Sequence, residues 1–165
     1  MTRMSVLLFL LAALATSLPS SAQSASAKPN LTGTWIFSAQ KSTLKIDPPT
    51  SMTLHIDQSD AQISFVRSQA YGEQKFDWKL ETVADGQKEV VQESSAYKTN
   101  VRVYWEGASL VLDQRITASD GTQATDTVTY SLADNGRVLQ AVERQTTVGG
   151  KGSTTNKWIY EKQSQ

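Results

Sequence analysis

The fold is decided by a short stretch near the N-terminus, Leu31-Thr32-Gly33-Thr34-Trp35-Ile36-Phe37. Trp35 and Phe37 would share one face of a strand here, because successive side chains of an extended chain point to opposite faces. We expect this strand to be the first of the domain. The strands that follow would then lie side by side until the last one closes back on the first.

The rest of the chain repeats one pattern, in which short alternating segments end at tight turns. Apolar and polar side chains alternate through residues 52–56, 63–67, 76–80 and 97–105. The turns between such segments are marked by Gly72, Asp85-Gly86, Glu106-Gly107, Asp120-Gly121, Asn135-Gly136 and Gly149-Gly150-Lys151-Gly152. Among these, Asp85-Gly86 favours a two-residue hairpin, because both central residues of a type I′ turn need positive φ.

These features predict an all-β fold with nine or ten strands in up-and-down order. Short strands joined by tight turns indicate antiparallel neighbours, and no segment after residue 27 has a helical period of ten residues. A sandwich usually needs long crossings, which the spacing of the turns does not provide. We therefore expect an antiparallel meander closed into a barrel of about 8–10 strands, which also removes exposed sheet edges.

The first 27 residues have the order of parts of a secretory signal peptide. Arg3 is followed by an apolar run at 6–15, and cleavage is expected after Ala22 or Ala27. The apolar run would span only about 15 Å as a helix, too short for a transmembrane anchor. Residues 28–165 would then form a single domain that is secreted or periplasmic. It contains no cysteine and hence no disulfide.

Charge and composition argue against several classes of function. The formal net charge is zero, and loss of Arg3 with the leader brings it to about −1, which offers no electrostatic footprint for nucleic acid. The only imidazole, His55, falls on the polar face of its strand and cannot by itself build a metal site. We therefore predict neither a metal, nor a cofactor, nor a catalytic residue. An enzyme would need a carboxylate and a tyrosine inside the barrel. The strand carboxylates leave that alternative open, because their spacing does not show a pair inside the barrel: Glu89, Glu93, Asp113, Asp126 and Glu143.

A family resemblance adds to this interpretation. Gly33-Thr34-Trp35, with Lys41-Ser42 and Pro48-Pro49 after it, resembles the first-strand region of small secreted bacterial lipocalin-like proteins, which are calycin-type barrels. Trp105-Glu106-Gly107 and the run from Tyr130 to Gly136 resemble later segments of the same proteins. The resemblance covers most of residues 28–165 and implies a lipocalin-like barrel.

The resemblance also implies how the barrel is closed. In calycins the first-strand tryptophan closes one end of the barrel and packs against a basic residue from a late strand. Gly33 and Trp35 match the first-strand positions. Arg144 or Lys157 could supply the basic residue, and Arg144 is the one we assign.

Binding is expected to depend on aromatic side chains that face the barrel interior. The candidate pocket-lining residues are Phe65, Arg67, Trp78, Tyr97, Trp105 and Tyr130. Flat aromatic faces suit an apolar ligand, and their polar groups can orient it. A buried unpaired arginine is costly, so we expect Arg67 at the rim, or against an acid or an anionic ligand head.

The primary hypothesis is therefore an exported binding protein for a small hydrophobic or amphipathic molecule, such as a fatty acid. The alternative is a non-catalytic envelope or interaction module that uses its outer strand faces or loops. Thr125, Thr127 and Thr129 would form such an outer face. The sequence leaves the oligomeric state open.

Overall fold

A computed structural model describes residues 28–147 and 152–164, and these form ten β-strands and two single-turn 3-10 helices. The 3-10 turns are η1 (Ala39–Lys41) and η2 (Asp134–Gly136). The strands are β1 (Gly33–Phe37), β2 (Ser51–Ser59), β3 (Gln62–Tyr71), β4 (Gln74–Val83), β5 (Glu89–Glu93), β6 (Tyr97–Glu106), β7 (Ser109–Ala118), β8 (Gln123–Ala133), β9 (Val138–Thr147) and β10 (Ser153–Lys162).

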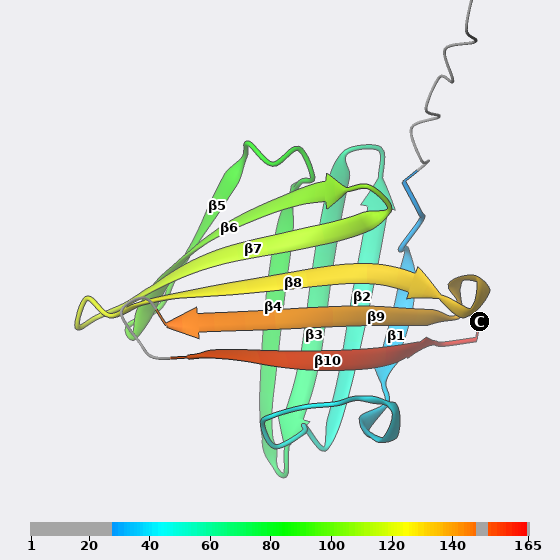
Figure 1. Cartoon of the computed structure of the whole chain (residues 1–165), viewed down its shortest axis with the longest axis horizontal. Coiled ribbons are helices and arrows are strands. Elements are labelled where there is room, and N and C mark those ends of the chain that lie inside the picture. Colours follow the sequence, from blue (N-terminus) through cyan, green and yellow to red (C-terminus); the bar gives the residue numbers. More distant parts are fainter. Residues whose placement is uncertain (1–27, 148–151, 165) are drawn as a thin grey trace, which may run out of the picture.

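All ten strands belong to one antiparallel sheet that rolls into a nearly closed barrel. Their order is β4-β3-β2-β1-β10-β9-β8-β7-β6-β5, so neighbours in sequence are neighbours in space. β1 pairs with β2 on one side and β10 on the other, as the first-strand stretch predicts. In Figure 1, β2–β4 form one layer and β6–β10 cross it in front. The predicted all-β meander barrel is confirmed.

The two layers enclose the core because the strands alternate as predicted. On β2 the side chains of Met52, Leu54 and Ile56 are buried, whereas Thr53 and His55 between them are partly exposed. The neighbouring strand β3 contributes the fully buried Phe65, and β6 of the other layer contributes Val101 and Val103. This alternation gives the barrel a largely apolar core and a polar outer surface.

One prediction about closure is wrong: β4 and β5 do not form a hairpin, and their facing edges remain unpaired with each other. The segment between them is a wider turn than Asp85-Gly86 suggests. The Asp85 carboxylate accepts hydrogen bonds from the backbone N–H groups of Gln87 and Lys88, and the N–H of Gly86 donates to the Val103 carbonyl oxygen at 2.9 Å. The bonds from Lys88 and Gln87 lower the pKa of Asp85, and the bond from Lys88 has the larger effect. The bond from Gly86 ties the turn to β6, and β4 and β5 are not paired with each other.

The corner around Trp35 also differs from the expectation. The Trp35 side chain is fully buried, and its indole N–H donates to the Leu31 carbonyl oxygen at 2.9 Å. The basic residue over its ring is Lys162, with Nζ 5.2 Å from the ring centroid, and not Arg144. Lys162 is the register partner of Trp35 in the β1–β10 pair.

The same corner explains the need for Gly33. The Lys162 side chain crosses the chain at Gly33, where a Cβ atom would lie 2.8 Å from the Lys162 Cε, and the φ of Gly33 is +149°. Arg144 and Lys157 are exposed on β9 and β10, so neither can take this place.

The leader predicted at residues 1–27 and the glycine turn at 149–151 lie outside the described residues. No helix in the described part of the chain has the length and apolar character to span a bilayer.

Candidate functional site: a polar-ended cavity inside the barrel

A half-open cavity of about 690 Å³ occupies the barrel interior on the side of the β4–β5 gap. Strands β3 to β9 all contribute to its wall. Its apolar lining comes from Trp78, Tyr97, Leu112, Ile116, Val128 and Tyr130, and its polar lining includes Arg67, Gln92, Thr99, Gln114, Asp126, Glu143 and Gln145. A volume of this size suits one small molecule.

The structure brings four of the six predicted pocket residues into this cavity: Arg67, Trp78, Tyr97 and Tyr130. Tyr97 is 54% exposed and lies at the mouth, whereas Tyr130 is buried. Phe65 does not line the cavity. It is fully buried behind the wall, with its ring centroid 5.7 Å from that of Tyr130 and 6.2 Å from that of Trp78, so it supports both rings.

Trp105, the sixth predicted residue, lies away from the cavity. It is partly buried against the core, and the Lys28 ammonium is 5.9 Å from its ring centroid. Alternation places Trp105 on the inward face of β6, but it does not indicate which part of a tilted strand borders a cavity. Its expected contact with a ligand therefore has no support in the geometry.

Glu143 forms one side of the polar end and is held by two buried donors. Its Oε2 accepts hydrogen bonds from the Asn156 amide at 2.7 Å and from the Trp158 indole N–H at 2.9 Å. Asn156 is itself fully buried, and its Oδ1 accepts the backbone N–H of Lys45 at 2.8 Å. Glu143 is therefore a fixed and well-partnered acid within the wall.

Asp126 forms the other side and is only half satisfied. Its Oδ2 accepts a hydrogen bond from the Gln114 amide at 3.0 Å, but its buried Oδ1 has no partner among the described residues. Burial, together with the charge of Glu143 on the neighbouring strand, raises the pKa of Asp126 to about 7, against a partial opposing effect of Arg67. Burial also raises the pKa of Tyr130 to about 12, so this phenol stays protonated at neutral pH.

Arg67 lies along the cavity wall rather than at the rim. It comes from the middle of β3, opposite Leu54 and Trp78, and its guanidinium carbon is 5.3 Å from the Trp78 ring centroid. Its buried Nε has no hydrogen-bond partner among the described residues. Two residues of the cavity wall therefore each have one buried atom without a partner among the described residues, a donor on Arg67 and an acceptor on Asp126.

Sequence reasoning did not single out Asp126 and Glu143 from the other strand carboxylates, although one signal for Asp126 was present. Asp126 shares its strand face with Val128 and Tyr130, and both of these face inward. An acid in register with inward apolar residues indicates a polar group inside the barrel. The pairing of Val128 with Glu143, which brings the second acid alongside, follows only from the β8–β9 register.

A side-chain bridge crosses the gap between β4 and β5. The Trp78 indole N–H donates to the Gln92 Oε1 at 2.9 Å, and the Gln92 Nε2 donates to the Lys79 carbonyl oxygen at 2.7 Å. Gln92 thus substitutes for the missing backbone ladder at the cavity mouth.

We expect Gln92→Ala to loosen this gap without unfolding the barrel. Loss of the two hydrogen bonds should cost about 1 kcal/mol of unfolding free energy, because both bonds lie near solvent. Amide hydrogen exchange on β5 should accelerate, while exchange on β8 and β9 stays as it was. Gln74→Ala, at an exposed position of β4, is the matched control. Unchanged β5 exchange in Gln92→Ala would show that the bridge does not hold the gap.

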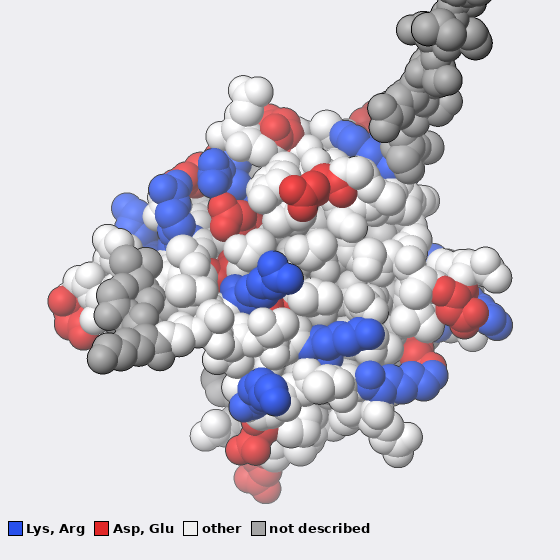
Figure 2. Space-filling view, in the orientation of Figure 1, with Lys and Arg blue, Asp and Glu red and all other residues white. Residues whose placement is uncertain are grey.

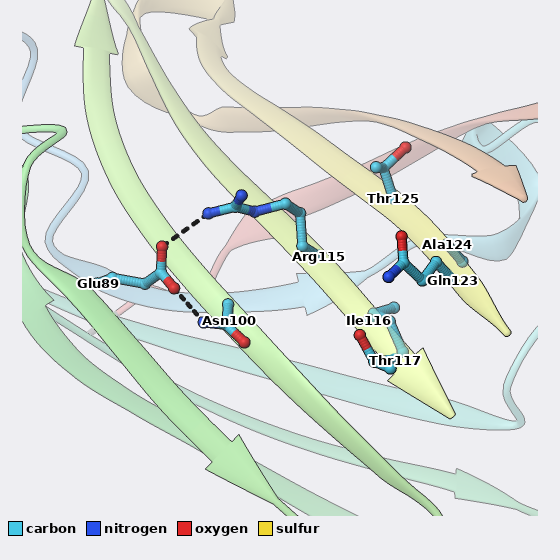
Figure 3. Close-up of a pocket in the computed structure, with 8 residues that line it drawn as sticks. All are labelled: Glu89, Asn100, Arg115, Ile116, Thr117, Gln123, Ala124 and Thr125. Carbon is cyan, nitrogen blue, oxygen red and sulfur yellow. Dashed lines mark hydrogen bonds and ion pairs between the residues drawn. The ribbon is translucent and has the colours of Figure 1, made fainter. Parts of the chain in front are cut away.

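Two further hollows lie on the outer surface. In Figure 3 the Glu89 carboxylate contacts Arg115, at 2.8 Å, and Asn100. The hydrogen bond from Asn100 is the main reason why the pKa of Glu89 is lowered. The hollow has a volume of about 340 Å³. Its charged groups satisfy each other, so they leave little for a ligand.

The second hollow surrounds His55. Its Nδ1 is 3.1 Å from the Thr34 hydroxyl and its Nε2 is 3.1 Å from the Asp57 carboxylate. The His55 side chain is 45% exposed and that of Asp57 is 64% exposed. Cross-strand pairing of Thr34 with His55 accounts for the arrangement. His55 is thus the solvated strand histidine that the sequence predicts.

The outer face of β6–β10 carries charges of both signs. Figure 2 shows acidic and basic side chains interspersed among uncharged ones on this face, without a large area of one sign. Within the described residues, no cluster of three or more metal-ligating side chains is present.

Comparison with known proteins shows the fold of the chain but does not assign it to a family. No family model matches the chain, and no curated protein matches its sequence. Among solved structures, apo lipid binding protein 8 of Caenorhabditis elegans is similar at a TM-score of 0.55 with 15% identity, covering 81% of this chain and 95% of that one.

Two more solved structures have the same fold. A secretary abundant heat soluble protein of Ramazzottius varieornatus has a TM-score of 0.56 and 11% identity, covering 82% of this chain and 98% of that one. The fluorescent protein UnaG has a TM-score of 0.54 and 19% identity, covering 80% and 96% of the two chains. None of these matches indicates a catalytic family. The chain therefore has the fold of the calycin-like β-barrels.

Proposed function

We propose that the protein is an exported, non-catalytic binding protein that holds one small amphipathic molecule inside its barrel. The observation that carries the proposal is the half-open cavity of about 690 Å³, with aromatic and aliphatic walls and a polar end. An apolar wall favours a ligand that escapes water, and a few fixed polar groups orient it. The export signal expected at residues 1–27 would place this carrier in the periplasm or outside the cell.

The fold supports this proposal in a general way. One of the solved structures with this fold is a lipid binding protein, which agrees with a ligand-binding barrel. Tyr130 and Trp78 form flat apolar walls, and Phe65 fixes both from behind. A rigid, preformed wall lowers the entropic cost of binding.

The surface gives less support to an interaction module. The exposed large apolar residues in the described part of the chain are Ile36, Ile46, Tyr71, Phe76, Val91 and Tyr97. They are spread over different strands and a loop. Among them, Tyr71 and Phe76 make an edge-to-face contact, with their ring centroids 6.2 Å apart. A docking face usually gathers such residues into one larger patch.

A cavity-filling substitution tests the proposal. The neutral probe N-phenyl-1-naphthylamine should bind the mature protein at about one site, with brighter and blue-shifted emission. Val128 lines the cavity on β8, and Val128→Trp should weaken probe binding at least about tenfold because the indole occupies the ligand's space. Fluorescence titration measures the loss.

The control is Thr129→Trp, which adds the same indole to the outer face of the same strand, since the side chains of neighbouring strand residues point to opposite faces. It should leave probe affinity unchanged. Circular dichroism establishes that both variants are folded. Equal probe binding by Val128→Trp and the control would contradict a ligand site in the cavity.

A further inference from the structure

The polar end of the cavity has two buried atoms without partners, and they have opposite hydrogen-bonding roles. Asp126 is 8% exposed, and its Oδ1 is an acceptor that nothing in the described protein satisfies. The Nε–H of Arg67 is a buried donor that also has no partner among the described residues. Buried polar atoms are rarely left unpaired, because an unpaired atom has lost its bonds to water and gains none in return. Two such atoms in a cavity wall indicate which hydrogen-bonding groups a ligand would need there.

The charges around the cavity limit what that group can be. At the polar end, Asp126 and Glu143 are two acids on neighbouring strands, and Arg67 is the cation that acts on Asp126. Three more charged residues line the cavity from β4 and β5: Asp77, Lys79 and Glu93. A carboxylate ligand could accept from Arg67 but cannot donate to Asp126, and it would add a third negative charge. An ammonium ligand could donate to Asp126 but cannot accept from Arg67, and it would place a cation beside the guanidinium.

An uncharged group with both a donor and an acceptor meets both requirements. A carboxamide offers N–H and C=O side by side, and a hydroxyl offers both on one atom. Neither group adds charge to a partly buried site, where an unpaired charge is costly.

We infer that the cavity selects amphipathic ligands with an uncharged head group of the carboxamide or alcohol type, and that it discriminates against free carboxylates and amines of the same chain length. The head group would donate to the Asp126 Oδ1 and accept from the Arg67 Nε–H, with its apolar chain along Trp78, Val128 and Tyr130. This inference rests on the proposed function, because it specifies the ligand of the same cavity.

The test is a head-group series with one common chain: dodecanamide, dodecan-1-ol, dodecanoate and dodecylamine. Each compound displaces N-phenyl-1-naphthylamine from the mature protein at pH 8, below its own aggregation concentration. Dodecanamide and dodecan-1-ol should bind at least about tenfold more tightly than dodecanoate or dodecylamine, because each charged head leaves one buried partner unpaired.

Asp126→Asn provides a sharper test, because it reverses the preference. Gln114 Nε2 donates to this side chain in the wild type, so the asparagine carbonyl should turn toward Gln114 and its NH₂ toward the cavity. The free acceptor then becomes a donor, and dodecanoate should gain on dodecanamide by about tenfold or more. Asp113→Asn removes the same charge from the outer face, where Asp113 pairs with Arg102, and should leave the ranking as in the wild type.

The outcomes separate the two proposals. If the probe fails to bind at all, the proposed function fails with this inference. If the probe binds but dodecanoate or dodecylamine competes as well as dodecanamide, or if no member of the series competes, only the head-group inference is overturned. An unchanged ranking in Asp126→Asn also overturns it.

Discussion

Asp126→Asn is expected to make the protein more stable at pH 8, although it removes a hydrogen-bonded acid from the interior. Asp126 is buried on β8, and its pKa of about 7 stands above the usual 3.8. Above pH 7 the folded protein must hold this carboxylate ionised close to Glu143 of β9, with only the charge of Arg67 of β3 to offset it. The neutral Gln114 of β7 donates one hydrogen bond to it, Gln145 of β9 is its register partner, and the protonated Tyr130 lies on the same strand face. An asparagine of the same size avoids that cost.

The direction of the pH dependence follows from proton binding. Between about pH 4 and pH 7 the folded state keeps a proton on Asp126 that the unfolded state releases, so the free energy of unfolding falls as the pH rises through this window. The difference of about 3 pKa units corresponds to at most about 4 kcal/mol at pH 8. Asp126→Asn should therefore gain up to about 4 kcal/mol at pH 8 and almost nothing near pH 4.

Urea denaturation at several pH values measures the free energy of unfolding of the wild type and of Asp126→Asn. Asp113→Asn is the control, because Asp113 pairs with Arg102 at 2.8 Å at a partly exposed site. It should lose about 1 kcal/mol or less at pH 8. Parallel stability curves for the wild type and Asp126→Asn would contradict the assignment of Asp126 as a destabilising buried acid.

Trp35→Ala is expected to cause the largest loss of stability, about 3–5 kcal/mol in the free energy of unfolding. The Trp35 side chain is fully buried and bonded to the Leu31 carbonyl oxygen, and Lys162 packs over its ring. Truncation leaves a cavity between the first and the last strand, which close the sheet. Urea denaturation followed by circular dichroism measures the loss without depending on tryptophan emission.

Trp105→Ala is the matched comparison for this prediction, because it removes the same side chain from a partly buried position. It should cost clearly less than Trp35→Ala, since less apolar surface leaves contact with the protein. If both substitutions cost the same, the junction of β1 with β10 is not the part of the fold on which closure depends.

The strand pattern could be predicted because it is local. Alternation decides which residues face inward, and turn residues mark where each strand ends, so the meander and its first strand follow from short segments. The contacts that close the barrel are not local. Lys162 reaches Trp35 through the register of β1 with β10. The family resemblance implied only a basic residue on a late strand, and it did not identify which one.

The same limit applies to the candidate site. Arg67, Trp78, Tyr97 and Tyr130 could be found because each shares a face with apolar neighbours. The nearness of Glu143 to Asp126 depends on how β8 and β9 slide against each other, because Asp126 pairs with Gln145 and Glu143 is its diagonal neighbour.

The gap between β4 and β5 was missed for a related reason. Asp85-Gly86 has the residues of a tight hairpin, but the turn bonds to Val103 on β6 instead of closing a ladder. β6 therefore decides the geometry of this turn, and the two turn residues alone do not indicate a contact with a third strand.

Native mass spectrometry of the protein, recovered gently from its own host, tests the central claim most directly. We predict a one-to-one complex with a small molecule that dissociates on solvent extraction and leaves the wild-type protein able to bind N-phenyl-1-naphthylamine. Val128→Trp prepared in the same way should carry no such mass, whereas Thr129→Trp should carry it. A clean apo mass for the wild type, in a protein that also fails to bind the probe, would contradict the account of a ligand-binding barrel.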